Sequence, residues 1–152
     1  MSPRAIERDT ILKRVNGIEA ETAALRGLAK LPFTDFLEAK GFELGQYHLH
    51  RALEGVFNIS AHILSRIPGG QATKYREMAQ NLGKFKIIDK QFAETELSEM
   101  ADYRNRLVHF YAEVKPEEVY DILQNHLGDF DIFLSAVKQV LEHPEKYGLS
   151  VE

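Results

Sequence analysis

Apolar residues recur along the chain at alternating spacings of three and four, the period that places side chains on one face of an α-helix. The first stripe consists of Ile11, Val15, Ile18, Thr22 and Leu25. It predicts a helix from about Pro3 to Leu28. The next stretch, "LPFTD", interrupts the pattern, and Thr34 is a candidate N-cap for a short helix that ends near Gly41.

The middle of the chain carries two further helical patterns. One stripe consists of Leu49, Ala52, Val56, Ile59, Ile63 and Ile67. The "PGG" stretch that begins at Pro68 stops it. A short helix is expected from Tyr75 to Leu82. A third long helix is expected to start near Asp89, and its apolar residues are Leu97, Met100, Ala101, Leu107 and Val108.

A fourth long helix is predicted to open at Pro116, because proline suits the first turn of a helix. Its stripe consists of Val119, Ile122, Leu123, Phe130, Phe133, Leu134, Val137 and Leu141. No segment alternates with period two strongly enough to predict a strand. The expected fold is therefore all-α, a bundle of about four main helices with short extra helices, in a single domain over residues 1–152.

Composition narrows the class of protein. A chain of 152 residues with 44% hydrophobic content can bury about 70% of its unfolded surface around one core. The start, "MSPRAIERDTILKRV", lacks the apolar region of a signal peptide, and no apolar run is long enough to span a membrane. The absence of cysteine excludes disulfides and thiolate chemistry and suits a reducing compartment. We therefore expect a soluble, cytoplasmic protein.

The charge of the protein as a whole does not favour nucleic-acid binding, because the formal net charge is −4. One segment is locally basic, with Lys74, Arg76, Lys84, Lys86 and Lys90. The simplest interpretation of this segment is a solvated connection between helices.

The stretch "DYRNRLVHFY" at residues 102–111 contains an anomaly. At about 100° per residue, Arg104 falls in the middle of the apolar arc of the third long helix, whereas Arg106 points away. A desolvated, unpaired arginine would be very costly, since arginine does not lose its proton at ordinary pH. Arg104 must therefore meet an anion, a polar partner or a wet cleft.

His109 follows Arg104 by five residues, about 140° around a regular helix. The two side chains could share a site only if the helix ended between them, and "AEVKP" favours an end there, because Pro116 restricts the residues before it. Histidine near neutral pH is a proton carrier, and the guanidinium fork suits a phosphate. Asn105 adds an amide and Tyr111 a hydroxyl. The alternative is structural: Arg104 pairs with a carboxylate inside the bundle and His109 caps helix carbonyls.

The spacing Arg104, four residues, His109, one residue, Tyr111 forms the pattern RxxxxHxY, which resembles the signature of HepT-like ribonuclease toxins of the HEPN superfamily. "YHLHRALEGVFNISAHIL" and "VKPEEVYDIL" are similar to the second helix and the post-motif segment of these proteins. The resemblance covers the chain from about Ile6 to Leu141.

The resemblance implies a homodimeric α-bundle, which can enter a larger hetero-oligomer, with two motifs at a cleft on the interface. Such proteins cleave RNA without a metal or other cofactor, and an MNT-type nucleotidyltransferase antitoxin is their partner. Arg104 and His109 would be catalytic, and Asn105 and Tyr111 would bind the substrate. In some systems the antitoxin adenylylates the motif tyrosine, here Tyr111. The alternative is a non-catalytic helical module that binds a nucleotide or the nucleotidyltransferase.

Other histidines carry weaker hypotheses. His48 and His62 lie near one helix face but are about 21 Å apart along its axis, too far to share a metal ion. No metal site is expected. His126 falls on the apolar stripe of the fourth long helix, and we expect it to be a core histidine with its polar atoms satisfied.

Overall fold

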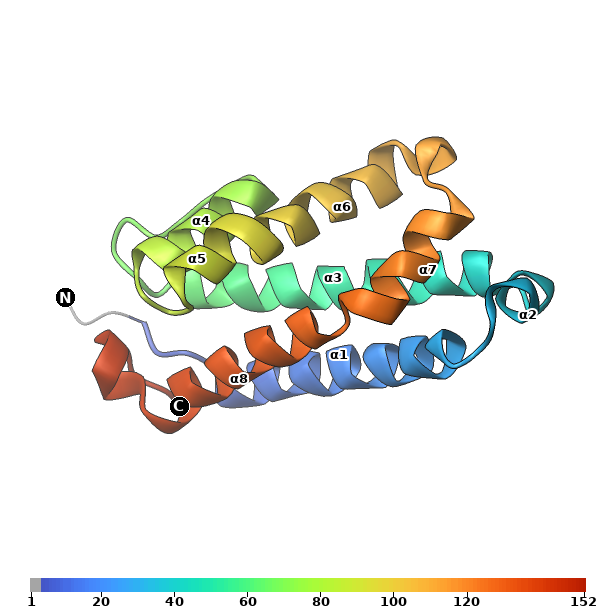
Figure 1. The fold of residues 1–152 in the computed structure, drawn as a ribbon. Helices are drawn as coiled ribbons and strands as arrows, with labels where there is room; N and C mark the ends of the chain where they lie inside the picture. Colours follow the sequence, from blue (N-terminus) through green and yellow to red (C-terminus); the bar gives the residue numbers. More distant parts are fainter. Residues whose placement is uncertain (1–3) are drawn as a thin grey trace.

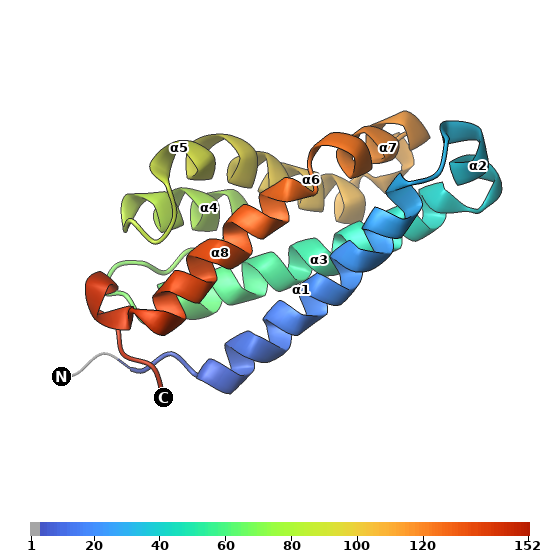
Figure 2. The ribbon, with the colours of Figure 1, turned by 60° about the horizontal axis from the view of Figure 1, so that its bottom comes forward.

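The structure is a computed structural model, and it describes residues 4–152. Two long antiparallel helices, α1 (Arg8–Ala29) and α3 (Gly41–Leu64), lie side by side along the molecule, and the short α2 (Phe33–Glu38) connects them at one end (Figures 1 and 2). The apolar stripes predicted for these helices are the buried faces: Ile11, Ile18 and Leu25 have at most 1% exposure. The α3 helix ends at Leu64, one turn before the last apolar residue of its predicted stripe.

The helices α4 and α6 pack over α3 (Figure 1). The short helix expected from Tyr75 is α4 (Tyr75–Lys84). The third long helix begins as predicted, and the Asp89 carboxylate caps it by accepting the Phe92 N–H at 3.0 Å. This helix consists of three pieces in sequence, namely α5 (Lys90–Phe92), the π-helical turn η1 (Ala93–Leu97) and α6 (Ser98–His109).

The predicted fourth helix is two helices, which corrects the expectation of a single long one. The chain leaves helical geometry at His126, with φ −126°, between α7 (Pro116–Asn125) and α8 (Gly128–Glu142). The apolar pattern cannot reveal this break, because Leu123 and Phe130 are seven residues apart, nearly two full turns, and both are buried. The remaining elements are the 3₁₀ turns η2 (Tyr111–Glu113) and η3 (Pro144–Tyr147).

The start of the first helix was predicted too early. Pro3 lies outside the described residues, and α1 begins only at Arg8. The preceding segment is extended, because Ile6 donates its N–H to the Ser150 carbonyl at 2.8 Å and accepts the Glu152 N–H at 2.9 Å. This bridge holds the two ends of the described chain together, as Figure 1 shows.

The all-α fold class is confirmed, and over residues 4–152 the only β-type pairing is this isolated bridge. One buried apolar cluster joins all the long helices, with Phe36, Phe57 and Phe133 among its largest members. In the same described part of the chain, no helix has the length and apolar character needed to cross a membrane.

Candidate active site

Arg104 lies on the inward arc of α6, and its side chain is only 15% exposed. Its Nε donates to Oε1 of Glu54 on α3, with an N–O distance of 2.5 Å. The predicted need for a partner is thus met by a carboxylate of the same chain. This pairing is the structural alternative expected for Arg104, in which it meets a carboxylate inside the bundle.

Two further contacts hold the Arg104 guanidinium. Its central carbon lies 4.2 Å from the centre of the Tyr75 ring on α4, in a cation–π arrangement. Its Nη1 donates to Oδ1 of Asn105 at 3.3 Å. Side chains from three helices therefore fix the guanidinium plane. Within residues 4–152, Nη2 has no hydrogen-bond partner, so part of the fork remains available to a ligand.

Glu54 contacts a second side chain as well. The Nε2 atom of His50, one turn earlier on α3, lies 3.6 Å from the same Oε1 atom that accepts from Arg104. The His50 side chain is 45% exposed, and that of Glu54 is 31% exposed. Glu54 thus brings an imidazole and a guanidinium to either side of one oxygen.

His109 is the last residue of α6, so the helix does not end between Arg104 and His109 as predicted. The His109 side chain is exposed and lies edge-on to Phe110, with 6.5 Å between ring centres. It makes no hydrogen bond to any residue of the described chain, and it caps no carbonyl there. Because the helix is continuous, the two motif side chains leave it in different directions, and a single chain does not bring them together.

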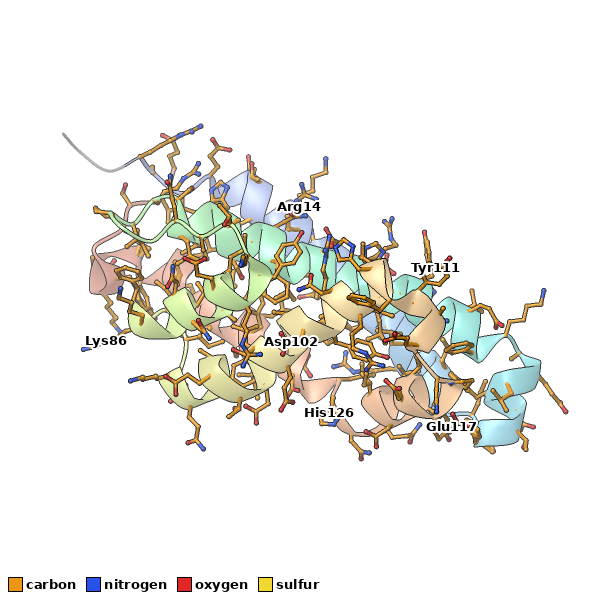
Figure 3. All side chains as sticks on the ribbon, turned by 90° about the horizontal axis from the view of Figure 1, so that it is seen from above. Arg14, Lys86, Asp102, Tyr111, Glu117 and His126 are labelled. Atoms are coloured by element: carbon orange, nitrogen blue, oxygen red, sulfur yellow. The ribbon has the colours of Figure 1, made fainter. Side chains whose placement is uncertain are left out.

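The aromatic residues that follow the motif histidine face solvent. Phe110 is 55% exposed and Tyr111, in η2, is 67% exposed. Figure 3 places Tyr111 on the outer edge of the molecule beyond the end of α6. Its hydroxyl is therefore accessible to a macromolecule.

Arg106 has a structural partner, which corrects the expectation that it simply points to solvent. It forms a two-pronged ion pair with Glu118 of α7, at 2.7 and 3.2 Å. The hydrogen bond to Glu118 raises the pKa of Arg106, and the same bond lowers the pKa of the Glu118 carboxyl. This pair joins α6 to α7 across the η2 turn.

A cleft of about 430 Å³ lies between α1 and α3 beside the Arg104 site. His50 and Glu54 line it, together with three cationic residues, namely Lys13, Arg14 and Arg51. Arg51 donates to Glu21 at 2.7 Å, and the other Glu21 oxygen contacts His48 at 2.6 Å. Burial alone would raise the pKa of Glu21, but these two hydrogen bonds lower it.

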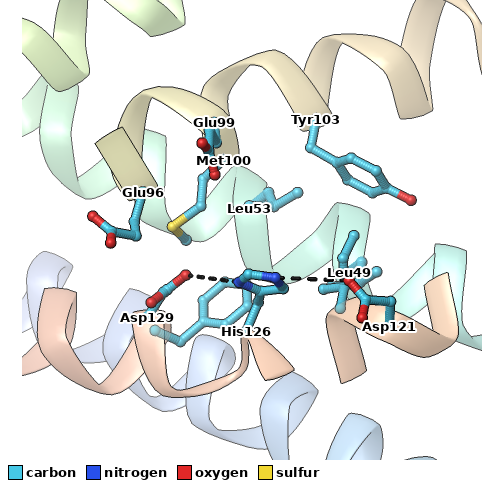
Figure 4. A pocket seen from close by; sticks show the side chains of 11 residues that line it. Leu49, Leu53, Glu96, Glu99, Met100, Tyr103, Asp121, His126 and Asp129 are labelled. Carbon is cyan, nitrogen blue, oxygen red and sulfur yellow. Dashed lines mark ion pairs between the residues drawn. The ribbon is translucent and has the colours of Figure 1, made fainter. Parts of the chain in front are cut away.

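A second, smaller cavity of about 160 Å³ lies on the opposite side of α3 (Figure 4). Its floor is apolar and its rim carries four carboxylates, those of Glu96, Glu99, Asp121 and Asp129. His126 stands at this rim, 48% exposed, between Asp121 at 3.8 Å and Asp129 at 3.7 Å. The expectation of a core histidine is therefore wrong, because the break between α7 and α8 turns His126 outward.

Three residues around Arg104 are not evident from the sequence pattern, namely His50, Glu54 and Tyr75. The spacing of four between His50 and Glu54 places them on one helix face, but nothing in the pattern pairs that face with Arg104, fifty residues away. Tyr75 lies in the basic segment that was interpreted as a solvated connection. The histidines considered for a metal have separate partners: Nε2 of His62 accepts the Glu7 N–H at 3.1 Å, and burial lowers the pKa of His62.

The fold and the site together define an α-helical bundle that presents a fixed arginine fork next to histidines, a combination suited to an anionic substrate. The sequence model described as "Ribonuclease HepT-like" matches residues 18–137, which include Arg104, His109 and Tyr111. The chain belongs to this family, and the resemblance inferred from the RxxxxHxY pattern is confirmed.

Two curated relatives carry related names. The chain is 26% identical over 88 residues to a protein named tRNA nuclease HepT from Aphanizomenon flos-aquae, an alignment that covers 58% of this chain and 59% of the relative. It is 30% identical over 95 residues to a protein named mRNA nuclease HepT from Shewanella oneidensis, covering 60% of this chain and 68% of the relative. The chain thus spans a little under two thirds of the length of the first of these relatives.

Proposed function

We propose that this chain is a metal-independent endoribonuclease and the toxin component of a toxin–antitoxin pair. The observation that carries the proposal is the Arg104 guanidinium, which three helices hold in place while Nη2 has no hydrogen-bond partner among the described residues. A fixed cationic fork stabilises the charge that develops on a phosphate during attack, and it does so without reorganising at the moment of reaction. Family membership and the names of both relatives support RNA as the substrate.

In the proposed reaction, the RNA 2′-hydroxyl attacks the adjacent phosphate. His109 accepts the hydroxyl proton, Arg104 binds the phosphorane oxygens, and Asn105 hydrogen-bonds the phosphate through its amide N–H groups. The products are a 2′,3′-cyclic phosphate and a 5′-hydroxyl. Because His109 and Arg104 diverge within one chain, the complete site is proposed to form in a two-fold dimer, where the partner subunit supplies the complementary residue.

One observation favours a second candidate, a helical module that binds a nucleotide or a nucleotidyltransferase without cutting RNA. Glu54 already neutralises Arg104, and within residues 4–152 no histidine hydrogen-bonds the guanidinium itself. A neutralised arginine without a proton carrier in direct contact suits binding better than catalysis. The two candidates differ in whether purified protein cleaves RNA.

The test is incubation of the purified protein with tRNA and with mRNA in the presence of EDTA. The proposed nuclease yields fragments ending in 2′,3′-cyclic phosphate, whereas intact RNA at high protein concentration supports the binding module. Arg104→Ala is expected to lower the cleavage rate by about 10²–10³-fold and His109→Ala by about 10²–10⁴-fold. Both should keep the helical circular dichroism of the parent.

Arg26→Ala is the matched control for these variants. It removes an arginine that pairs with a carboxylate, Asp131 at 2.7 Å, on a different face of the molecule. Its cleavage rate should equal that of the parent. If Arg104→Ala or His109→Ala cleaved RNA as fast as this control, the assigned roles would be wrong.

Tyr111 is proposed as the site where an MNT-type nucleotidyltransferase antitoxin silences the enzyme by adding AMP. The 67% exposure of its side chain supports access by another protein. The added phosphate would compete for arginine donors, and the nucleoside would obstruct RNA. Co-expression with the nucleotidyltransferase should add the mass of AMP to the parent but not to Tyr111→Phe. Full inhibition of unmodified protein would instead indicate occlusion by the partner.

A further inference from the structure

The proposed cleavage needs two proton transfers, and in the proposed dimer each Arg104 is complemented by one His109, that of the partner subunit. One group must remove the proton from the 2′-hydroxyl, and another must protonate the 5′-oxygen as its bond to phosphorus breaks. In an in-line displacement the attacking and leaving oxygens lie on opposite sides of the phosphorus, so one imidazole cannot contact both at once. A phosphate bound at Arg104 therefore requires a second proton carrier within reach.

His50 is the histidine that shares a partner with Arg104. Its Nε2 lies 3.6 Å from the Glu54 oxygen that accepts from the Arg104 Nε at 2.5 Å. In the described part of the chain, no such link joins Arg104 to His109. A phosphate that binds Nη2 of Arg104 is thus expected to lie close to the His50 ring.

The environment of His50 matches that of a general acid held in place. Oε1 of Glu54 lies 3.6 Å from Nε2, within ion-pair distance, and a carboxylate at that position favours one orientation of an imidazolium ring. The other ring nitrogen, Nδ1, has no hydrogen-bond partner among residues 4–152 and is free to transfer a proton. The ring is 45% exposed and faces the cleft between α1 and α3.

We propose that His50 is the general acid of the cleavage reaction and that Glu54 is a positioning residue for both His50 and Arg104. This inference rests on the proposed ribonuclease function. The 2′-oxygen forms a bond to phosphorus and its proton passes to His109. The bond from phosphorus to the 5′-oxygen breaks, and the proton of the His50 imidazolium passes to that oxygen. His50 ends neutral and His109 protonated.

The cleft also suits the RNA segment that carries the leaving 5′-oxygen. Lys13, Arg14 and Arg51 line it next to His50, and cationic side chains along a groove bind a nucleic-acid backbone. Figure 3 shows Arg14 on the side of the molecule where Tyr111 also lies, away from His126. Glu21 neutralises Arg51 in part, which leaves Lys13 and Arg14 as the freer cations. The RNA segment that begins with the 5′-oxygen is assigned to this cleft.

The competing explanation is that His50 and Glu54 form an ordinary surface pair at a spacing of four on a helix, which stabilises the helix by only about 0.2–0.5 kcal/mol. A leaving-group experiment separates the two. The substrate is an RNA oligonucleotide that the parent cleaves, prepared once with the natural linkage and once with sulfur in place of the bridging 5′-oxygen at the cut site. A thiolate leaves without needing a proton.

The His50→Ala variant is expected to cleave the natural linkage about 10²–10⁴-fold more slowly than the parent. It should cleave the sulfur linkage at nearly the parent rate. His50→Gln should behave in the same way. His109→Ala should lose activity on both substrates, because removal of the 2′-hydroxyl proton is needed in each case. Glu54→Gln should also lose activity on both, since Glu54 positions Arg104 as well.

His126→Ala is the control. It removes a histidine of similar exposure, 48%, that also lies near carboxylates but on the opposite side of α3. It should match the parent on both substrates. Equal rates for His50→Ala and His126→Ala on the natural linkage would overturn the role of His50 while leaving the ribonuclease intact. A parent protein that cleaves neither substrate would overturn the proposed function, and the assignment of His50 with it.

Discussion

At the scale of single residues, two neighbours on α6 differ in whether their buried polar groups have partners. Arg104 is nearly buried, but a carboxylate, an aromatic face and an amide satisfy its charge. Tyr103 is partly buried, and its hydroxyl oxygen lies out of contact with solvent with no hydrogen-bond partner in the described chain (Figure 4). An unpaired buried polar group is destabilising, whereas an apolar group of the same shape is tolerated.

The Tyr103 hydroxyl predicts a measurable pH dependence. Burial raises the pKa of Tyr103 to about 12, above the model-peptide value of 10.0. Between pH 10 and 12 the unfolded chain loses the Tyr103 proton while the folded chain keeps it, so the free energy of unfolding falls as pH rises. Tyr103→Phe should remove this loss. At neutral pH it should be neutral or stabilising by up to about 1 kcal/mol.

Urea titrations at several pH values measure this effect, and Tyr111→Phe is the control because its side chain is 67% exposed. The control should lose as much stability as the parent between pH 10 and 12. A Tyr103→Phe variant with the same alkaline loss as the parent would contradict the prediction.

At the scale of elements, the close approach of α1 and α3 positions the candidate site, because Glu54 and His50 belong to α3 (Figure 2). Gly55 lies on α3 next to Glu54, and a Cβ atom there would come within 2.6 Å of Cγ1 of Ile18 on α1. Only glycine allows this spacing. The glycines at 41 and 45 are similar: a Cβ at Gly45 would lie 2.7 Å from Cγ1 of Val119.

This contact predicts opposite effects for two glycine-to-alanine changes within helices. Gly55→Ala should destabilise the fold by about 1–3 kcal/mol, because the added methyl group overpacks the helix pair. Gly17→Ala on α1 meets nothing within 4 Å and should stabilise the fold by about 0.5–1 kcal/mol through higher helix propensity. Urea denaturation of both variants measures the difference. Equal changes in the free energy of unfolding for the two variants would contradict the prediction, because α1 and α3 could then move apart without loss of stability.

At the scale of the whole molecule, the described surface has exposed aromatic residues beside the motif. Phe110 and Tyr111 are 55% and 67% exposed, and they follow His109, which has no hydrogen-bond partner among residues 4–152. Exposed aromatic side chains next to polar groups are enriched in protein interfaces. They support the two-fold dimer more directly than the burial of Arg104, which Glu54 explains.

We therefore predict a dimer at micromolar concentration, measured by light scattering. Phe110→Asp should shift the mass towards the monomer and lower RNA cleavage, while the helical circular dichroism stays unchanged. Ile132→Asp is the control, because Ile132 is 48% exposed but lies on α8, away from the motif. A parent protein that remains monomeric, or a control that dissociates equally, would contradict the assignment of this surface.

The sequence by itself determined the fold class, most helices and the position of Arg104 on a buried arc, because helical periodicity is a local property that a few turns of chain already express. The motif spacing identified the family for the same reason. The tertiary structure alone decided what Arg104 contacts, since Glu54 and Tyr75 are fifty and twenty-nine residues away along the chain. It also decided where helices begin and end. The bridge between Ile6 and Val151 keeps the segment before α1 extended, and the turn at His126 separates α7 from α8. These outcomes depend on packing between distant segments, and no window of local sequence contains that packing.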